Sequence, residues 1–179
     1  MKIFKRILLV IGVLVALFFI IPLFVDGTLK SVKEITINKP KQQVYDYVVL
    51  LKNQDNFSKW AKMDPNMKKE YKGVDGTVGF VSAWDSENGD VGKGEQTIMA
   101  IKPGERIDYD LHFIKPFDSK ATCYISFKEL DSVNTKVTWG FNSKMAYPFN
   151  IMTLFTNMNE MIGKDFEEGL NNLKAILEK

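Results

Sequence analysis

The sequence predicts an α+β protein, in which a seven-stranded antiparallel sheet wraps around one long C-terminal helix and a separate transmembrane helix stands at the N-terminus. Three observations lead to this fold class. Residues 7–25 are 19 consecutive uncharged and largely apolar residues. Residues 67–145 alternate between apolar and polar side chains across repeated turn signals. Residues 149–178 carry apolar side chains at intervals of three and four.

Composition bounds the function before any motif is considered. The 179 residues include 24 basic and 22 acidic ones, and three of the basic residues lie in the first six positions. The remainder therefore has 21 basic against 22 acidic residues, which predicts no nucleic-acid partner. Cys123 is the only cysteine, so we expect no disulfide and no cysteine metal site. It reads as a small apolar filler in a strand.

The N-terminal segment has two interpretations, an uncleaved anchor and a signal peptide. Its apolar run is longer than the apolar region of most signal peptides and offers no small-x-small cleavage site, which favours a single-pass membrane anchor over residues 1–25. Lys2, Lys5 and Arg6 place the N-terminus in the cytoplasm and the domain outside, although Lys30 and Lys33 weaken that orientation. A short linker at 26–31 then holds the domain (32–179) within about 20 Å of the membrane.

Between the linker and the C-terminal helix, the sequence predicts one strand, two short helices and six further strands, in that order. Residues 32–38 form a strand, Pro40 opens a helix over 41–53, and a second short helix covers 56–63. Turn signals such as Asn88-Gly89 and Pro103-Gly104 then separate six strands. Those strands are expected at 67–72, 77–85, 94–101, 106–114, 120–130 and 136–144.

Alternation within these strands predicts a sheet with one aromatic, apolar face and one polar face. In 106–114, for example, Tyr109 and Phe113 share a side, while His112 lies on the other. An apolar sheet face has to be covered. The helix predicted over 149–178, about 45 Å long, is the only element long enough to cover it.

The order of elements resembles the helix-grip fold, and residues 32–179 resemble the polyketide cyclase/dehydrase and lipid-transport family of the START-like (SRPBCC, Bet v 1-like) superfamily. The resemblance is carried by VKEITINKPKQQVYDYV, FSKWAKMDP, VGKGEQTIMAIKPGERIDYDLHF, TKVTWGF and MIGKDFEEGLNNLKAIL. It implies a deep apolar cavity between the sheet and the C-terminal helix. It implies no particular reaction, because the superfamily includes carriers, cyclases and chaperone cofactors.

Residues with catalytic chemistry are few. His112 is the only histidine, which excludes a multi-histidine metal site, and we expect neither a metal nor a cofactor. Its alternation places it opposite the cavity, as a solvated surface side chain. Asp85 and Glu95 flank the Asn88-Gly89 turn, where the two carboxylates meet across a hairpin or simply face solvent.

Aromatic and methionine side chains are the remaining signal, as packed core or as the lining of a cavity for a lipid-like or polyketide-like molecule. The candidate ligand-binding residues are Phe80, Trp84, Tyr109, Phe113, Trp139, Met152, Phe155, Met158 and Ile162. We expect a membrane-anchored module that binds a hydrophobic small molecule without catalysis. Two alternatives stay open: a cyclase or dehydratase that uses a cavity carboxylate or tyrosine, and a protein-interaction module. The sequence does not predict the ligand or the oligomeric state.

Overall fold

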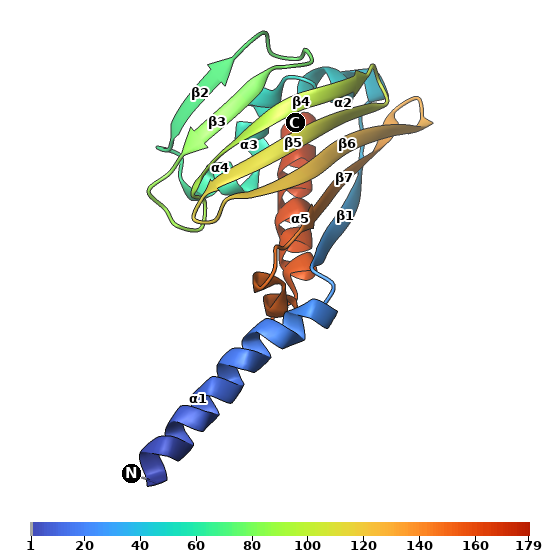
Figure 1. Ribbon diagram of the computed structural model, residues 1–179. Coiled ribbons are helices and arrows are strands. Elements are labelled where there is room, and N and C mark those ends of the chain that lie inside the picture. The colour runs from blue at the N-terminus through green and yellow to red at the C-terminus, as the bar shows by residue number, and fades with distance from the viewer. Residues whose placement is uncertain (1) are drawn as a thin grey trace.

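The computed structural model describes residues 2–179 and shows the predicted α+β architecture, a seven-stranded sheet with its helices on one face (Figure 1). All neighbouring strands are antiparallel, in the order β1-β7-β6-β5-β4-β3-β2, so β1 lies at one edge beside the last strand and β2 lies at the other. The strands are β1 (Thr28–Ile37), β2 (Lys68–Lys72), β3 (Val81–Asp85), β4 (Lys93–Lys102), β5 (Arg106–Lys115), β6 (Ser119–Asp131) and β7 (Asn134–Lys144).

The helices fall into one that projects away from the sheet and several that pack on it (Figure 1). The α-helices are α1 (Lys2–Ile20), α2 (Lys41–Val48), α3 (Gln54–Phe57), α4 (Lys59–Met63) and α5 (Met158–Leu177), and the short 3₁₀ helices are η1 (Ile21–Phe24), η2 (Leu51–Asn53) and η3 (Phe149–Leu154). We call the sheet face toward α2–α5 the inner face. The end of the domain where β1 begins, β7 ends and α5 begins is the α1 end.

Alternation places the core on the inner face. In β5, Ile107 and Tyr109 are at most 1% exposed, whereas the intervening Asp108 and the following Asp110 reach solvent on the outer face. The inner side chains of β4, β6 and β7 follow the same rule. They pack against buried residues of the helices, which include Val44, Phe57, Phe166, Leu170 and Leu173. This burial removes apolar surface from water at about 25 cal/mol per Å², which stabilises the fold.

The continuous helix predicted over 149–178 is wrong in its first third. The chain forms η3, leaves helical structure at residues 155–157, and begins α5 only at Met158. Asn157 starts the new helix, because its Oδ1 accepts a hydrogen bond from the backbone N–H of Glu160 at 3.2 Å. Thr153 and Thr156 turn their hydroxyls onto backbone carbonyls within the same segment, an arrangement that competes with regular helix.

Smaller differences concern element ends. The helix predicted at 56–63 is divided at Ser58 into α3 and α4. Strand β1 begins at Thr28, within the predicted linker, so only three residues separate it from η1. Strand β3 begins at Val81, later than predicted, after a loop that contains Gly73, Gly76 and Gly79, all with positive φ.

One helical segment, Ile3–Phe24, is long and apolar enough to cross a membrane. Its described side chains are exposed except for that of Pro22, which is buried. Val25, the residue after the segment, is half-buried. A signal sequence has the same length and composition, so the segment establishes a membrane-spanning capacity and no orientation.

Candidate functional site

The middle of the inner face is closed by tight aromatic packing. The ring of Trp139 on β7 stacks on Phe166 of α5 with centroids 4.5 Å apart, and Phe57 meets Trp139 edge-on at 5.7 Å. Gly169 lets α5 approach this closely, because a Cβ there would lie 2.9 Å from Cζ3 of Trp139. The middle of α5 therefore packs tightly on the sheet.

Toward the α1 end the inner face is less completely covered. Leu111, Phe113 and Phe141 are only partly buried, although each alternates with outward-facing residues and so belongs to the inner face. Across from them, Met158 and Ile162 in the first two turns of α5 are also partly buried. At the α1 end, apolar side chains of the inner face are therefore partly accessible beside the buried Leu29 and Ala121.

Two buried polar atoms on the inner face have no hydrogen-bond partner among the residues that the structure describes. They are the hydroxyl of Tyr109 and the indole nitrogen Nε1 of Trp139. Burial raises the pKa of Tyr109 well above its usual value, so its hydroxyl stays protonated. Nearby, the side-chain amide of Gln96 donates to Oε1 of Gln54 at 3.2 Å. Each unpartnered donor carries a desolvation cost that a ligand or water oxygen would relieve.

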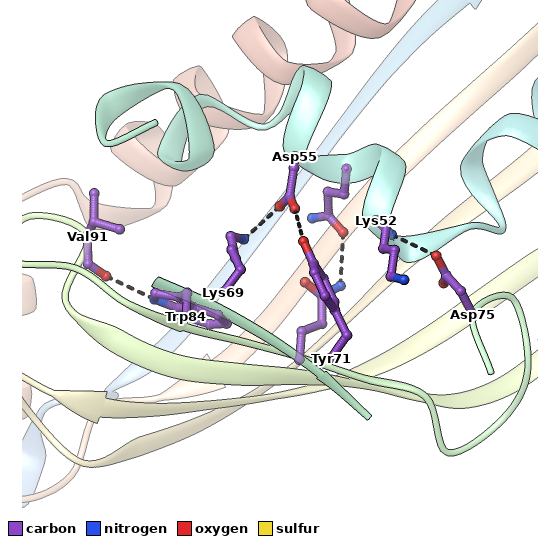
Figure 2. Close-up of polar contacts among 9 residues, drawn as sticks. Lys52, Asp55, Lys69, Tyr71, Asp75, Trp84 and Val91 are labelled. Carbon is purple, nitrogen blue, oxygen red and sulfur yellow. Dashed lines mark hydrogen bonds and ion pairs between the residues drawn. The ribbon is translucent and has the colours of Figure 1, made fainter. Parts of the chain in front are cut away.

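At the β2 edge of the sheet, the carboxylate of Asp55 connects α3 to β2 (Figure 2). Asp55 accepts a hydrogen bond from the Nζ of Lys69 and another from the hydroxyl of Tyr71, both at 2.6 Å. Desolvation, followed by the contact with Asp55, raises the pKa of Tyr71 far above its usual value. We call Asp55, Lys69 and Tyr71 the edge cluster. It fixes an otherwise free strand to the helix that covers it.

A second carboxylate secures the neighbouring turn (Figure 2). Asp75, in the loop between β2 and β3, accepts hydrogen bonds from the backbone N–H groups of Leu51 at 2.7 Å and Lys52 at 3.2 Å. The Nζ of Lys52 lies 4.7 Å from the centroid of the Tyr71 ring, a cation–π contact. The helical segment and the sheet edge are therefore joined at two points, which closes this side of the inner face.

The nine candidate residues divide into three groups. Phe80, Tyr109 and Trp139 are at most 2% exposed in the core of the inner face. The partly buried candidates Trp84, Phe113, Met158 and Ile162 lie around the less covered part. The structure does not bring Met152 and Phe155 to the inner face, because the break before α5 leaves them 48% and 79% exposed in and after η3.

Two hollows lie at the α1 end, and both reach the first residue of β1. The larger, of about 740 Å³, crosses the outer face of the sheet and is lined by Glu95, Asp110 and His112 among others. The smaller, of about 270 Å³, lies beside the turn that contains Phe155 and Met158. Apart from these two candidates, the predicted lining residues border neither hollow.

The ionisable residues considered from sequence lie away from the inner face. His112 is on the outer face as predicted, with Nδ1 at 3.9 Å from Glu95 and Nε2 at 3.3 Å from Asp118. Asp85 and Glu95 do not meet across the hairpin, because Asp85 pairs with Lys93 at 2.7 Å while Glu95 lies opposite Ala83. These carboxylates are therefore not placed for acid/base chemistry on an inner-face ligand.

Solved structures share this fold over most of the domain. The chain resembles Ara h 8.0201 at 18% identity and a TM-score of 0.57, covering 84% of this chain and 98% of that one. It resembles an uncharacterised protein from Bacillus thuringiensis (14%, 0.59, 84% and 99%) and an Aha1 dimer from Colwellia psychrerythraea (12%, 0.56, 84% and 96%). These matches establish the Bet v 1-like helix-grip fold. No protein-family model and no curated protein sequence matches the chain.

Sequence reasoning did not find the edge cluster or the polar groups of the inner face. Asp55 and Tyr71 lie 16 positions apart on different elements, and neither belongs to a recognisable motif. The alternation that places Tyr109 inward was visible, but its lack of a hydrogen-bond partner depends on every neighbouring side chain. Gln96 carried a usable signal, since it is a polar residue at an inward position of β4.

Proposed function

We propose that this protein is a membrane-anchored, noncatalytic module that binds a hydrophobic small molecule, lipid-like or polyketide-like, on the inner face of its helix-grip domain. The observation that carries the proposal is the incomplete cover at the α1 end, where Phe113, Phe141 and Ile162 are only partly buried. An apolar molecule placed against these side chains would complete their burial, at about 25 cal/mol per Å² before ordering costs.

The buried polar donors favour a ligand with at least one oxygen. A ligand whose apolar chain lies against Phe113 and Phe141, and whose carbonyl, carboxyl or hydroxyl group enters deeper as the surrounding side chains move apart, would accept hydrogen bonds from Tyr109 and Trp139. A ligand that binds this way is amphipathic. That chemistry is consistent with the resemblance to the polyketide cyclase/dehydrase and lipid-transport family and with the division of the chain into an anchor, a short linker and a binding domain.

The membrane part of the proposal rests on α1 and η1. The segment has the length of a spanning helix, and the basic residues at its N-terminal end favour a cytoplasmic N-terminus with the domain on the other side. Only residues 25–27 lie between η1 and β1, so the domain stays at the membrane surface. Such a module suits extraction, sensing or delivery of a membrane-derived molecule better than transport over a distance.

The test fills the less covered part of the inner face. Ile162→Trp enlarges a partly buried inward side chain, and Met161→Trp is a matched control at the adjacent exposed position. The full chain in lipid nanodiscs is titrated with a fluorescent long-chain fatty acid, and native mass spectrometry identifies retained lipids. We expect Ile162→Trp to weaken binding about tenfold, equivalent to about 1.4 kcal/mol, and the control to bind normally. Equal binding by both variants, or no retained ligand in the parent protein, contradicts the proposal.

A further inference from the structure

The last turns of α1 and η1 are bonded to the segment before α5. Asn150 is 7% exposed, and its Nδ2 donates to the backbone carbonyls of Pro22 and Val25, each at 2.8 Å. The hydroxyl of Tyr147 donates to the carbonyl of Phe19 at 3.0 Å. Gly27 permits this approach, because a Cβ there would lie 2.8 Å from Cβ of Asn150. η3 is therefore held against the end of the apolar helix, as Figure 1 shows beside the upper end of α1.

Large apolar side chains are exposed on and beside η3. Phe149, Met152, Leu154 and Phe155 are 48–79% exposed, and Phe117 of the β5–β6 turn is 72% exposed with its ring centroid 6.3 Å from that of Phe149. We call these five residues the apolar patch. They come from two segments distant in sequence, so the patch is formed by the fold. Contiguous exposed apolar surface of this kind is typical of an interaction site.

The chain around η3 has the composition of a membrane interface. Residues 145–159 contain no charged side chain in fifteen positions, whereas 26% of the whole chain is charged. The Tyr147–Phe19 bond fixes the depth of the segment, because Phe19 lies six residues before Val25, which ends the apolar run. At 1.5 Å per residue this is roughly 9 Å inside that end. Apolar side chains of interfacial segments are buried about 5–10 Å into the boundary between headgroups and acyl chains, which matches this depth.

We propose that the apolar patch inserts into the interfacial region of the same bilayer that α1 crosses, as a second membrane contact that fixes the orientation of the domain. The inference rests on the anchoring part of the proposed function and not on its ligand. The bonds of Asn150 and Tyr147 bring the patch to α1 without further motion, so insertion adds buried apolar area at little ordering cost. The bilayer thereby covers side chains that the protein itself leaves exposed.

Depth-dependent quenching tests the proposal in the full chain reconstituted into phosphatidylcholine vesicles. Phe155→Cys is labelled with an environment-sensitive fluorophore, and Val74→Cys is the matched control, since Val74 is an apolar side chain 71% exposed in the β2–β3 loop. Native Cys123 is buried, so the unlabelled parent protein gives the background. We expect doxyl-labelled lipids to quench the label at position 155 at least about threefold more than the label at 74.

Carbonate extraction separates failure of the anchor from failure of the patch. A chain that stays in the membrane while its label at position 155 is quenched no more than at 74 overturns the patch and leaves the anchor standing. A chain that carbonate removes from the vesicles overturns the anchor and the inference together. The fatty-acid titration above is independent of both readouts, so ligand binding is decided separately.

Discussion

The hydroxyl of Tyr109 is a buried hydrogen-bond donor, and its desolvation cost can be measured as a change in the free energy of unfolding. Because it has no partner among the described residues, Tyr109→Phe removes a desolvation penalty, and we expect the free energy of unfolding to rise by about 1 kcal/mol. Tyr71→Phe is the control of opposite sign, since it removes a 2.6 Å hydrogen bond to Asp55 and should destabilise by a similar amount. Urea denaturation of both variants measures the difference. A destabilised Tyr109→Phe variant would show that the hydroxyl has a partner in solution.

The same substitution has a pH signature. Burial raises the folded-state pKa of Tyr109 well above the value near 10 of the unfolded chain. Above pH 10 the unfolded state therefore loses a proton that the folded state keeps, so the stability of the parent protein falls as pH rises. Tyr109→Phe lacks this proton, and its stability should fall less steeply, by up to about 1.4 kcal/mol per pH unit. If the free energy of unfolding fell equally steeply with pH in both proteins between about pH 10 and 11, this would contradict a raised pKa for Tyr109 in the folded state.

Gly169 tests the tight contact between the middle of α5 and the sheet. A Cβ at position 169 meets the Trp139 ring at 2.9 Å, and that ring is held between Phe166 and Phe57, so Gly169→Ala should destabilise by about 1–2 kcal/mol despite the better helix propensity of alanine. Gly163→Ala is the matched control on the same helix. Its Cβ meets the end of the flexible Lys33 side chain and the hydroxyl of Ser31, both of which can move aside. Thermal unfolding should rank Gly169→Ala clearly below Gly163→Ala.

At the scale of elements, pattern predicted the sheet and failed at the junction before α5. Strand alternation depends on neighbours two positions apart, so the seven strands and their inward faces were readable from the sequence. The apolar spacing of Ile151, Leu154 and Phe155 fits a helix as well as the spacing within α5 does, so the pattern alone does not show the break. The side chain of Asn150, however, bonds to residues 125 and 128 positions away, and no local pattern contains that contact. Seven of the nine candidate residues lie outside this junction, and they lie on the inner face: six belong to β3, β5, β7 and α5, and Phe80 directly precedes β3.

The joint between η1 and η3 depends on the donor atoms of one amide. Asn150→Asp replaces Nδ2 with a carboxylate oxygen that faces the carbonyls of Pro22 and Val25, so two hydrogen bonds become two repulsive contacts in a buried place. We expect the melting temperature of the full chain in detergent micelles to fall, with a loss of about 2–3 kcal/mol. Asn171→Asp, on the exposed face of α5, makes the same chemical change without burial and should melt as the parent protein does. Equal melting of both variants would mean that the joint contributes nothing to stability.

At the scale of the whole molecule, the least covered part of the inner face, both hollows and the apolar patch all lie at the α1 end. Phe113 precedes the β5–β6 turn that carries Phe117, and Met158 follows directly on the segment that carries Phe155. A ligand that leaves the bilayer beside α1 would therefore meet the partly buried inner face first. We therefore expect the rate of ligand uptake from the bilayer to depend on the distance between the domain and the membrane.

Lengthening the connection tests that dependence. A twenty-residue Gly/Ser insertion after Val25 keeps α1 in the membrane and lengthens the connection between η1 and β1. Tyr147→Phe and Asn150→Ala are added to remove the hydrogen bonds between η3 and the end of α1, and Phe155→Ser to weaken the apolar patch, so that the domain can leave the surface. The effective concentration of bilayer lipid at the inner face then falls, so we expect the rate of uptake of a fluorescent fatty acid from the protein's own vesicle to fall several-fold. The same three substitutions with the insertion after Lys179 leave the short connection intact and control for the added chain and for the substitutions. Because the inner face itself is unchanged, affinity measured at equilibrium should be equal in both insertions. Uptake at the parent rate with the linker after Val25 would mean that ligand reaches the domain through water, independently of where α1 holds it.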